Sequence, residues 1–244
     1  MLIIYIQRKN MFKNIKTYVA VSLFALVSAC GGGGGGESAV NTPVASTESF
    51  PLITILNNML QSGSSTFTVS GTSGGSVVTG SGNATRGSLS AGTFEAAPAQ
   101  QRTTTITGSF TVNGSSFSLN GSTVSWVDSN NIPLGETGGA DYVVVTGTPT
   151  IPTTVRVNDT GSLYVADRYT NSTKSVKRGT LTITYVVEAD TASTALLTLI
   201  RTEKDNQSIT TTTNAGQFRI TPAGSLTRVK ETGLTGDTSI VITY

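Results

Sequence analysis

The sequence predicts an all-β protein, in which an antiparallel meander forms a strongly curved sheet, a half-barrel or a barrel, with one short N-terminal helix. Composition is the first reason: the 244 residues include 42 Thr, 28 Ser and 27 Gly, and Thr favours strands while Ser and Gly supply turns. From Ser65 onward, apolar residues alternate with polar ones, which is the period of a half-buried strand. No helical pattern of about 10–15 residues separates the strands, and this excludes parallel βαβ units.

Residues 1–30 have the layout of a secretory signal peptide. A cationic stretch contains Arg8, Lys9, Lys13 and Lys16. The apolar run that follows, residues 18–27, is much shorter than the roughly 20 residues that span a bilayer. Either Met1 or Met11 could be the start, because a complete signal also begins at Met11.

The end of this segment, Val27-Ser28-Ala29-Cys30, resembles the bacterial lipobox. The resemblance covers these four residues and the preceding apolar run, and Val27 stands where Leu is commoner. It implies that the chain is cut before Cys30, the only cysteine, whose thiol carries diacylglycerol while the new amine receives an acyl chain such as palmitate. The lipid bilayer is therefore the expected partner, through acylated Cys30. Beyond this motif the chain is similar to β-rich lipoproteins of Gram-negative bacteria, a likeness that implies no activity.

The resemblance also implies a location in the cell envelope. In lipoproteins, a residue other than Asp after the cysteine favours the outer membrane, and Gly31 fits that pattern; the periplasmic and surface faces both stay open. Residues 31–49 are predicted to be a flexible Gly-rich tether, which places the β domain, residues 50–244, about 20–25 Å from the membrane.

Charge and residue types exclude several functions. The four cations before Cys30 account for the apparent basicity: the remaining chain has 12 Lys and Arg against 14 Asp and Glu, so no nucleic-acid partner is expected. The sequence has no His and one Cys, which excludes Ser-His-Asp and Cys-His sites and an internal disulfide. We expect no catalytic residues, no cofactor and no metal.

Residues 50–62 are the only good helix candidate. Ser49 can cap this helix, Pro51 suits its first turn, and Gly63 ends it. One apolar stripe comprises Leu52, Ile53, Ile55, Leu56, Met59 and Leu60. Such a short helix must dock: packing on the sheet is the main expectation, and covering the mouth of a ligand site is the alternative.

The clearest strand pair is residues 106–119. Asn113-Gly114 is a strong signal for a two-residue hairpin turn. Such a turn pairs Val112 with Ser115 and places Phe110 opposite Phe117, on the same face.

Residues 177–244 are predicted to form an antiparallel meander of about six strands. Short turns, including one at residues 214–216, separate them. The expected strands are residues 181–187, 195–204, 209–213, 217–221, 226–230 and 238–244.

Several motifs suggest chemistry, but each has a simpler explanation. Residues 71–75 match the G-x-S-x-G elbow, yet lack the helix and the His partner it needs. Asp128-x-Asn130 and Asn158-Asp159 are interpreted as turns rather than calcium loops. Glu188 with Asp190, and Glu203 with Asp205, have the spacing of carboxylate pairs on one strand face, but are expected to be solvated strand ends.

Two further groups of residues are assigned structural roles. Arg168, Lys174, Lys177 and Arg178 form a basic cluster around Tyr164 and Tyr169, predicted to be a solvated loop, with anion or sugar binding as the alternative. Ile240, Ile242 and Tyr244 resemble the last strand of a transmembrane barrel, but are expected to close the sheet with the aromatic in the core.

These observations predict a membrane-anchored, non-catalytic lipoprotein with a binding or structural role. One alternative is a carrier of a hydrophobic ligand in a half-barrel, with the helix as its lid. A second alternative is a His-free hydrolase with paired carboxylates. The sequence identifies no protein or glycan partner.

Overall fold

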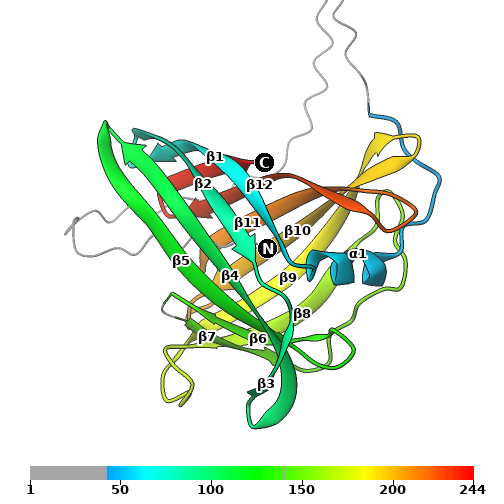
Figure 1. Cartoon of the computed structure of the whole chain (residues 1–244), viewed down its shortest axis with the longest axis horizontal. Coiled ribbons are helices and arrows are strands. Elements are labelled where there is room, and N and C mark those ends of the chain that lie inside the picture. Colours follow the sequence, from blue (N-terminus) through cyan, green and yellow to red (C-terminus); the bar gives the residue numbers. More distant parts are fainter. Residues whose placement is uncertain (1–42, 140) are drawn as a thin grey trace, which may run out of the picture. The chain divides into compact units, whose positions relative to one another are not determined.

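The computed structural model describes residues 43–139 and 141–244, so Cys30, the signal segment and most of the tether lie outside the described residues. The described part contains one helix followed by thirteen strands (Figure 1). Their order in the sheet is β2-β1-β13-β12-β11-β10-β9-β8-β7-β6-β5-β4-β3, and an additional pairing joins β2 to β4. This pairing closes a 12-stranded antiparallel barrel and leaves β3 outside the ring. Of the three predicted forms, the barrel is confirmed.

The helix is α1 (Leu52–Met59), and the strands vary from five to sixteen residues. They are β1 (Gly63–Ser73), β2 (Ser76–Arg86), β3 (Ser90–Phe94), β4 (Ala97–Val112), β5 (Ser115–Val127), β6 (Pro133–Gly138), β7 (Asp141–Thr146), β8 (Thr160–Tyr169), β9 (Lys177–Thr191), β10 (Thr194–Lys204), β11 (Thr210–Ile220), β12 (Leu226–Thr235) and β13 (Thr238–Thr243).

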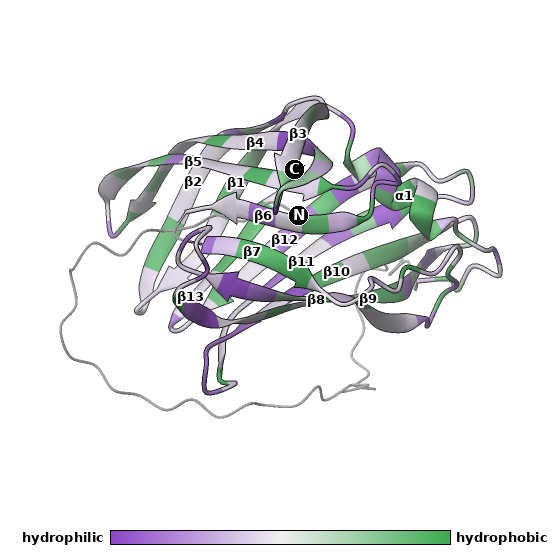
Figure 2. Ribbon diagram, turned by 90° about the horizontal axis from the view of Figure 1, so that it is seen from below, coloured by the Kyte–Doolittle hydropathy of each residue, from purple (hydrophilic) through white to green (hydrophobic). Residues whose placement is uncertain are grey.

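Side chains alternate between the barrel interior and its outer surface. On β9 and β10, apolar residues such as Leu181 and Leu197 point inward, while Thr182 and Thr198 occupy the outer positions. The same alternation appears as bands of hydropathy along the ribbons in Figure 2. Outer positions of β4 carry Thr or Ser from Thr103 to Thr111, where a lipid-facing strand would need apolar residues. No helix among the described residues is long and apolar enough to cross a membrane.

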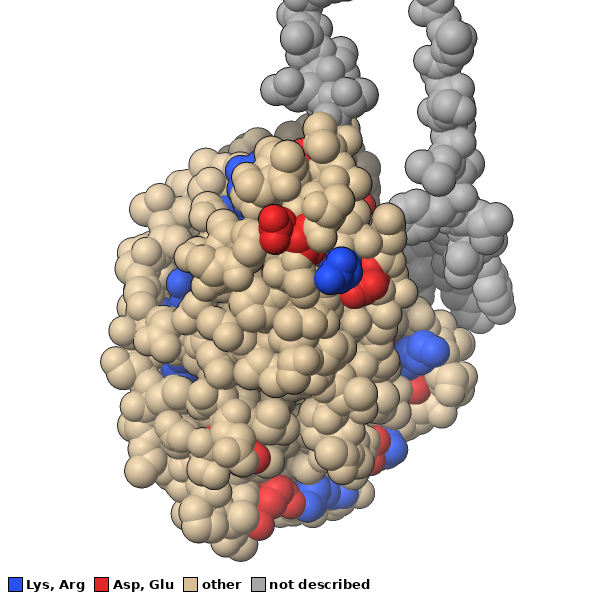
Figure 3. Space-filling model, turned by 90° about the vertical axis from the view of Figure 1, so that its right-hand side faces the viewer, with Lys and Arg blue, Asp and Glu red and all other residues tan. Residues whose placement is uncertain are grey.

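Two clusters of buried apolar residues lie in different parts of the interior. The larger cluster contains inward residues of β7–β11 together with Leu52 and Ile55 of α1, both fully buried. The second cluster, here called the apolar wall, consists of Phe67, Val69, Val78, Ala84, Ile106, Leu119 and Ile242. The helix thus packs on inward-facing residues, as the sequence predicts, at an end of the barrel whose surface carries few charges (Figure 3).

The helix is shorter than the predicted residues 50–62. Phe50 is held as extended chain by two backbone hydrogen bonds with Val155, of 2.8 and 2.9 Å. The helix therefore starts after Pro51, and no side chain caps it, so the cap predicted at Ser49 is wrong. Its end is a tight turn, in which the amide of Leu60 donates to the carbonyl oxygen of Asn57.

The C-terminal meander has five strands rather than six. β11 continues through residues 214–216, where the sequence suggested a turn. Gly216 lies opposite Leu199 on one side and Glu231 on the other, at an inward position. A Cβ on Gly216 would lie 3.2 Å from the Phe218 ring. This glycine therefore provides space for packing inside the barrel, not a change of chain direction.

The hairpin predicted at Asn113-Gly114 is confirmed. Both residues have positive φ, 49° and 76°, as a type I′ turn requires. Val112 pairs with Ser115, and the rings of Phe110 and Phe117 stack with centroids 5.3 Å apart.

Candidate functional site

Charged side chains occupy inward positions of the barrel in two groups. The first, here called the balanced network, contains Glu136, Asp141, Arg168, Arg178, Arg201 and Glu203. The second, here called the arginine cluster, contains Arg86, Arg102 and Arg228 and lies beside Glu231 and Tyr244. The two groups differ in how completely their charges are paired.

In the balanced network every cation contacts a carboxylate. Arg168 Nη2 lies 2.6 Å from Asp141 Oδ2 and 2.8 Å from Glu203 Oε2. Arg201 donates to Glu203 over 2.8 Å and also pairs with Glu136. Burial opposes the charge of Arg201, but Glu136 and Glu203 outweigh it and raise the pKa of Arg201.

The remaining member of the balanced network is Arg178. Its Nη1 atom lies 2.7 Å from Asp141 Oδ1, so Asp141 serves two arginines. Three arginines and three carboxylates therefore form a set with no net charge. Such a set has the composition of a structural network.

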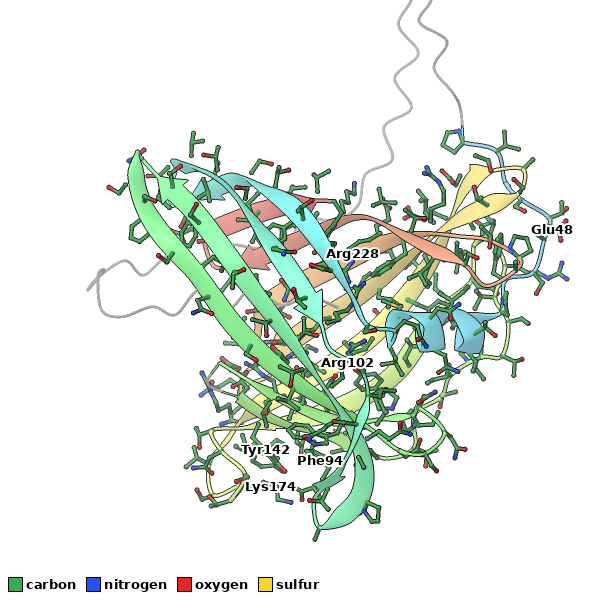
Figure 4. All side chains as sticks on the ribbon, viewed as in Figure 1. Glu48, Phe94, Arg102, Tyr142, Lys174 and Arg228 are labelled. Atoms are coloured by element: carbon green, nitrogen blue, oxygen red, sulfur yellow. The ribbon has the colours of Figure 1, made fainter. Side chains whose placement is uncertain are left out.

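The arginine cluster is assembled from three strands. Arg86, at the end of β2, lies beside β4, where it is paired with Thr104. Arg102 precedes Thr104 by two residues on β4 and so shares its inward face. Arg228 projects from β12, opposite Phe218 on β11. Figure 4 shows Arg102 and Arg228 within the ring of strands.

Packing fixes two of these guanidinium groups. Arg102 Nη1 donates a 2.6 Å hydrogen bond to the carbonyl oxygen of Met59, the last residue of α1. The guanidinium carbon of Arg228 lies 4.6 Å from the ring centroid of Tyr244 and 5.7 Å from that of Phe218. These are cation–π distances.

The cluster retains polar atoms that have no hydrogen-bond partner among the described residues. They are buried and comprise Arg86 Nε, Arg102 Nε and Arg228 Nη1. Arg228 Nη1 does lie 3.2 Å from Glu231 Oε1, close enough for charge attraction but without hydrogen-bond geometry. Buried donors are normally satisfied, and leaving one unpaired costs about 1–3 kcal/mol.

The charges of the arginine cluster are not balanced. Glu231 is the only carboxylate with an ion-pair distance to any of its three arginines in the described part of the chain. Burial, followed by repulsion from Arg86 and Arg228, lowers the pKa of Arg102 to about 10. Burial and Arg228 likewise lower the pKa of Arg86. The fold thus holds like charges close together at partly or fully buried positions.

The carboxylates of the two pairs suggested by the sequence are engaged in ion pairs, hydrogen bonds or a turn. Glu188 and Asp190 lie on the outer side, where Asp190 pairs with Arg219 at 2.6 Å and Glu188 accepts from Thr198. Glu203 was expected to be solvated, but it is 2% exposed because it bridges two buried arginines. Asp205 remains in a turn, where its Oδ1 accepts from the amides of Gln207 and Ile209.

The predicted basic loop is not a free cationic surface. Arg168 is 5% exposed and lies inside the barrel, so its assignment to a solvated loop is wrong. Lys174 pairs with Glu95, and Lys177 Nζ lies 2.7 Å from Asp167 Oδ1. With Arg178 bound to Asp141, each cation has a carboxylate partner. The sequence missed these partners because most of them are distant along the chain.

The turn interpretations are confirmed. Residues 71–75 span the end of β1 and the tight turn to β2. Asp128 Oδ1 accepts from the amides of Asn130 and Ile132, each at 2.8 Å. Asp159 Oδ2 accepts from the amide of Arg156. The described residues contain no group of three or more His, Cys, Asp or Glu side chains arranged to hold a metal.

The C-terminal strand closes the barrel as predicted. β13 pairs with both β12 and β1, and Ile242 is 4% exposed within the apolar wall. The Tyr244 ring packs edge-to-face on Phe67 with centroids 6.2 Å apart. The terminal aromatic therefore borders the arginine cluster.

Sequence reasoning missed Arg86, Arg102 and Arg228 as a group. A signal was present: Arg102 has the same parity along its strand as Ile106, so alternation places it on the buried face. Arg86 has the same relation to Ala84. A charged residue in register with an apolar face is unusual and marks a candidate site.

Comparisons with protein-family models, curated proteins and solved structures give no match to this chain. Its function is therefore inferred from the barrel interior and from the residues around Cys30.

Proposed function

We propose that this protein is a lipid-anchored, non-catalytic binding protein of the bacterial cell envelope, which holds a small ligand inside its barrel. The observation that carries the proposal is that the Nε–H groups of Arg86 and Arg102 are buried and have no hydrogen-bond partner among the described residues. A protein that needed these arginines only for stability would pair them, as it pairs those of the balanced network.

The anchor half of the proposal is supported by the lipobox-like residues 27–30. A cysteine carrying two or more acyl chains attaches a protein stably to a bilayer. Residues 31–49, rich in glycine, then give the barrel freedom to move above the membrane. We propose the outer membrane as its location.

The non-catalytic part is supported by the chemistry of the interior. The chain has no His, and the inward carboxylates Asp141 and Glu203 bind the same guanidinium nitrogen of Arg168, at 2.6 and 2.8 Å. A glycoside hydrolase needs one protonated carboxyl and space for the bond between the pair. The guanidinium of Arg168 occupies the position between the two carboxylates, where the substrate bond would have to lie, which argues against the hydrolase.

Three measurements test the proposal. Intact-mass spectrometry of the full chain extracted from membranes should find Cys30 at the N-terminus with diacylglyceryl and acyl additions, and Cys30→Ser should leave the membrane fraction. A panel of anionic, neutral and apolar small molecules should include at least one that raises the midpoint of thermal unfolding. An unmodified cysteine contradicts the anchor, and a folded protein that responds to no compound contradicts the binding role.

A further inference from the structure

We propose that the arginine cluster binds the anionic head of a single-chain amphiphile, and that its alkyl chain lies along the apolar wall. This rests on the proposed function, since it names the ligand class of the same barrel interior. The head is a carboxylate or a phosphate ester. Both are anionic groups of oxygens, planar or tetrahedral, that accept several hydrogen bonds.

The head is assigned from the geometry of the donors. Guanidinium groups match the oxygens of carboxylates and phosphates with paired, charge-assisted hydrogen bonds. Arg86, Arg102 and Arg228 reach the interior from three different strands. The Nε atoms of Arg86 and Arg102 are buried and have no hydrogen-bond partner among the described residues, while Arg228 Nη1 contacts Glu231 only as an ion pair. Arg102 is 92% buried, because its exposed fraction is 8%. An anion placed among them would satisfy these donors and offset their mutual repulsion.

The balanced network provides an internal comparison. Its three arginines contact three carboxylates of the same chain, so it offers no net charge to a ligand. In the arginine cluster, Glu231 alone has an ion-pair distance to Arg228 among the described residues. Charge complementarity therefore selects the arginine cluster for an anion.

The alkyl chain is assigned from the inward positions beyond the arginines. On β2 the inward face continues from Arg86 to Ala84 and Val78, and on β4 it continues from Arg102 to Ile106. These apolar residues belong to the apolar wall. The arginine cluster at one end and the apolar wall beside it match a ligand that has one anionic head and one alkyl chain.

The interior has space beside this wall. Gly121, paired with Ile106, occupies an inward position of β5. A Cβ built on Gly121 would meet no described atom within 4 Å. The next two inward residues, Thr123 and Ser125, are half-buried, so they are not completely covered by other side chains.

Binding is measured with the acylated full chain in a neutral, sugar-headed detergent, by native mass spectrometry and calorimetry. The probes are decanoate, decyl phosphate and decanol. We expect one decanoate or decyl phosphate per chain, with decanol at least about tenfold weaker. Arg102→Gln and Arg228→Gln should each weaken the anions by about tenfold or more, the usual effect of losing a charged hydrogen bond. The control Arg156→Gln, at an exposed position, should have no effect.

Gly121→Leu provides an independent test of ligand binding if the arginine variants fold poorly. It leaves the arginines in place and fills the space beside Ile106, so both anions should bind about tenfold more weakly or not at all. The tighter-binding anion identifies the head as carboxylate or phosphate. Decanol binding as tightly as decanoate, or anion binding unaffected by Arg102→Gln and Gly121→Leu, overturns this inference and leaves the proposed function intact. A folded protein that binds none of the probes overturns this inference, while its response to the broader compound panel decides the proposed function separately.

Discussion

Arg102 on β4 donates a 2.6 Å hydrogen bond to the carbonyl oxygen of Met59, so the arginine cluster is tied directly to the end of α1. Because Met59 ends the helix, its carbonyl oxygen has no backbone amide within the helix to accept a hydrogen bond from. The guanidinium of Arg102 supplies that donor. This contact positions Arg102 and connects the helix that packs on the interior with the residues proposed to bind the ligand.

The balanced network is predicted to support folding rather than binding. Glu203→Gln leaves the buried Arg168 and Arg201 with one carboxylate fewer, which typically costs about 3–5 kcal/mol. We expect chemical denaturation to show a loss of that order. The control Lys177→Gln removes an ion pair whose lysine side chain is 45% exposed and should cost less than about 1 kcal/mol. Equal losses for the two variants would show that the buried network is not a structural element.

The hairpin between β4 and β5 is predicted to need its glycine. Gly114 has φ of +76°, a conformation in which a Cβ is strained, so Gly114→Ala should lower the free energy of unfolding by about 1 kcal/mol. Gly121→Ala on β5, where the backbone needs no positive φ, is the matched control and should not destabilise the protein. Thermal unfolding of the two variants measures the difference, and a harmless Gly114→Ala would contradict the assigned turn.

The single tryptophan reports on the packing of β3 outside the ring. The Trp126 and Phe94 rings stack with centroids 4.8 Å apart, and Phe94 is 5% exposed. Phe94→Ala should remove this cover and shift the fluorescence emission of Trp126 to longer wavelength. Phe117→Ala, at a ring that is 38% exposed on the far hairpin, should leave the emission unchanged. An unshifted spectrum in Phe94→Ala would mean that β3 does not pack on Trp126.

Tyr142 gives a prediction for alkaline pH. Partial burial, followed by its hydrogen bond to Glu95, raises the pKa of Tyr142 to about 12. The protonated phenol is therefore favoured by the fold: its contribution is complete below about pH 10, the ordinary value for tyrosine, and is lost as pH rises through 12. Solvent screening limits this contribution to about 1 kcal/mol.

The check compares wild type with Tyr142→Phe. The difference in their free energies of unfolding should stay constant up to about pH 10 and shrink between pH 10 and 12. A difference that begins to shrink well below pH 10 would contradict the hydrogen bond to Glu95.

Local patterns predicted much of the fold. Alternation and the Asn113-Gly114 turn gave the strands and the pairing of Phe110 with Phe117, because both signals act over a few residues. Closure of the barrel depends on the pairing of β2 with β4. Composition, the alternation of apolar residues and the turn signals could not predict this pairing. The turn signal at residues 214–216 was misleading, since Gly216 serves the packing of Phe218 instead.

The candidate site was less predictable than the fold. Arg86, Arg102 and Arg228 are separated by 16 and 126 positions in the chain, and only the closed barrel brings them together. The partners of Arg168 are equally remote, since Asp141 and Glu203 lie on β7 and β10. Charge pairing across a sheet depends on which distant strands become neighbours, and local sequence patterns do not determine that.

The most direct test is to identify what the barrel carries in its own membrane. The acylated protein should be purified from the producing cells, its non-covalently bound lipids extracted into organic solvent and analysed by mass spectrometry; covalent acyl chains on Cys30 stay with the protein. The account predicts about one anionic single-chain amphiphile per wild-type chain, and its loss when Arg86, Arg102 and Arg228 are all changed to Gln. An extract from the folded triple variant that matches the wild-type extract would contradict it.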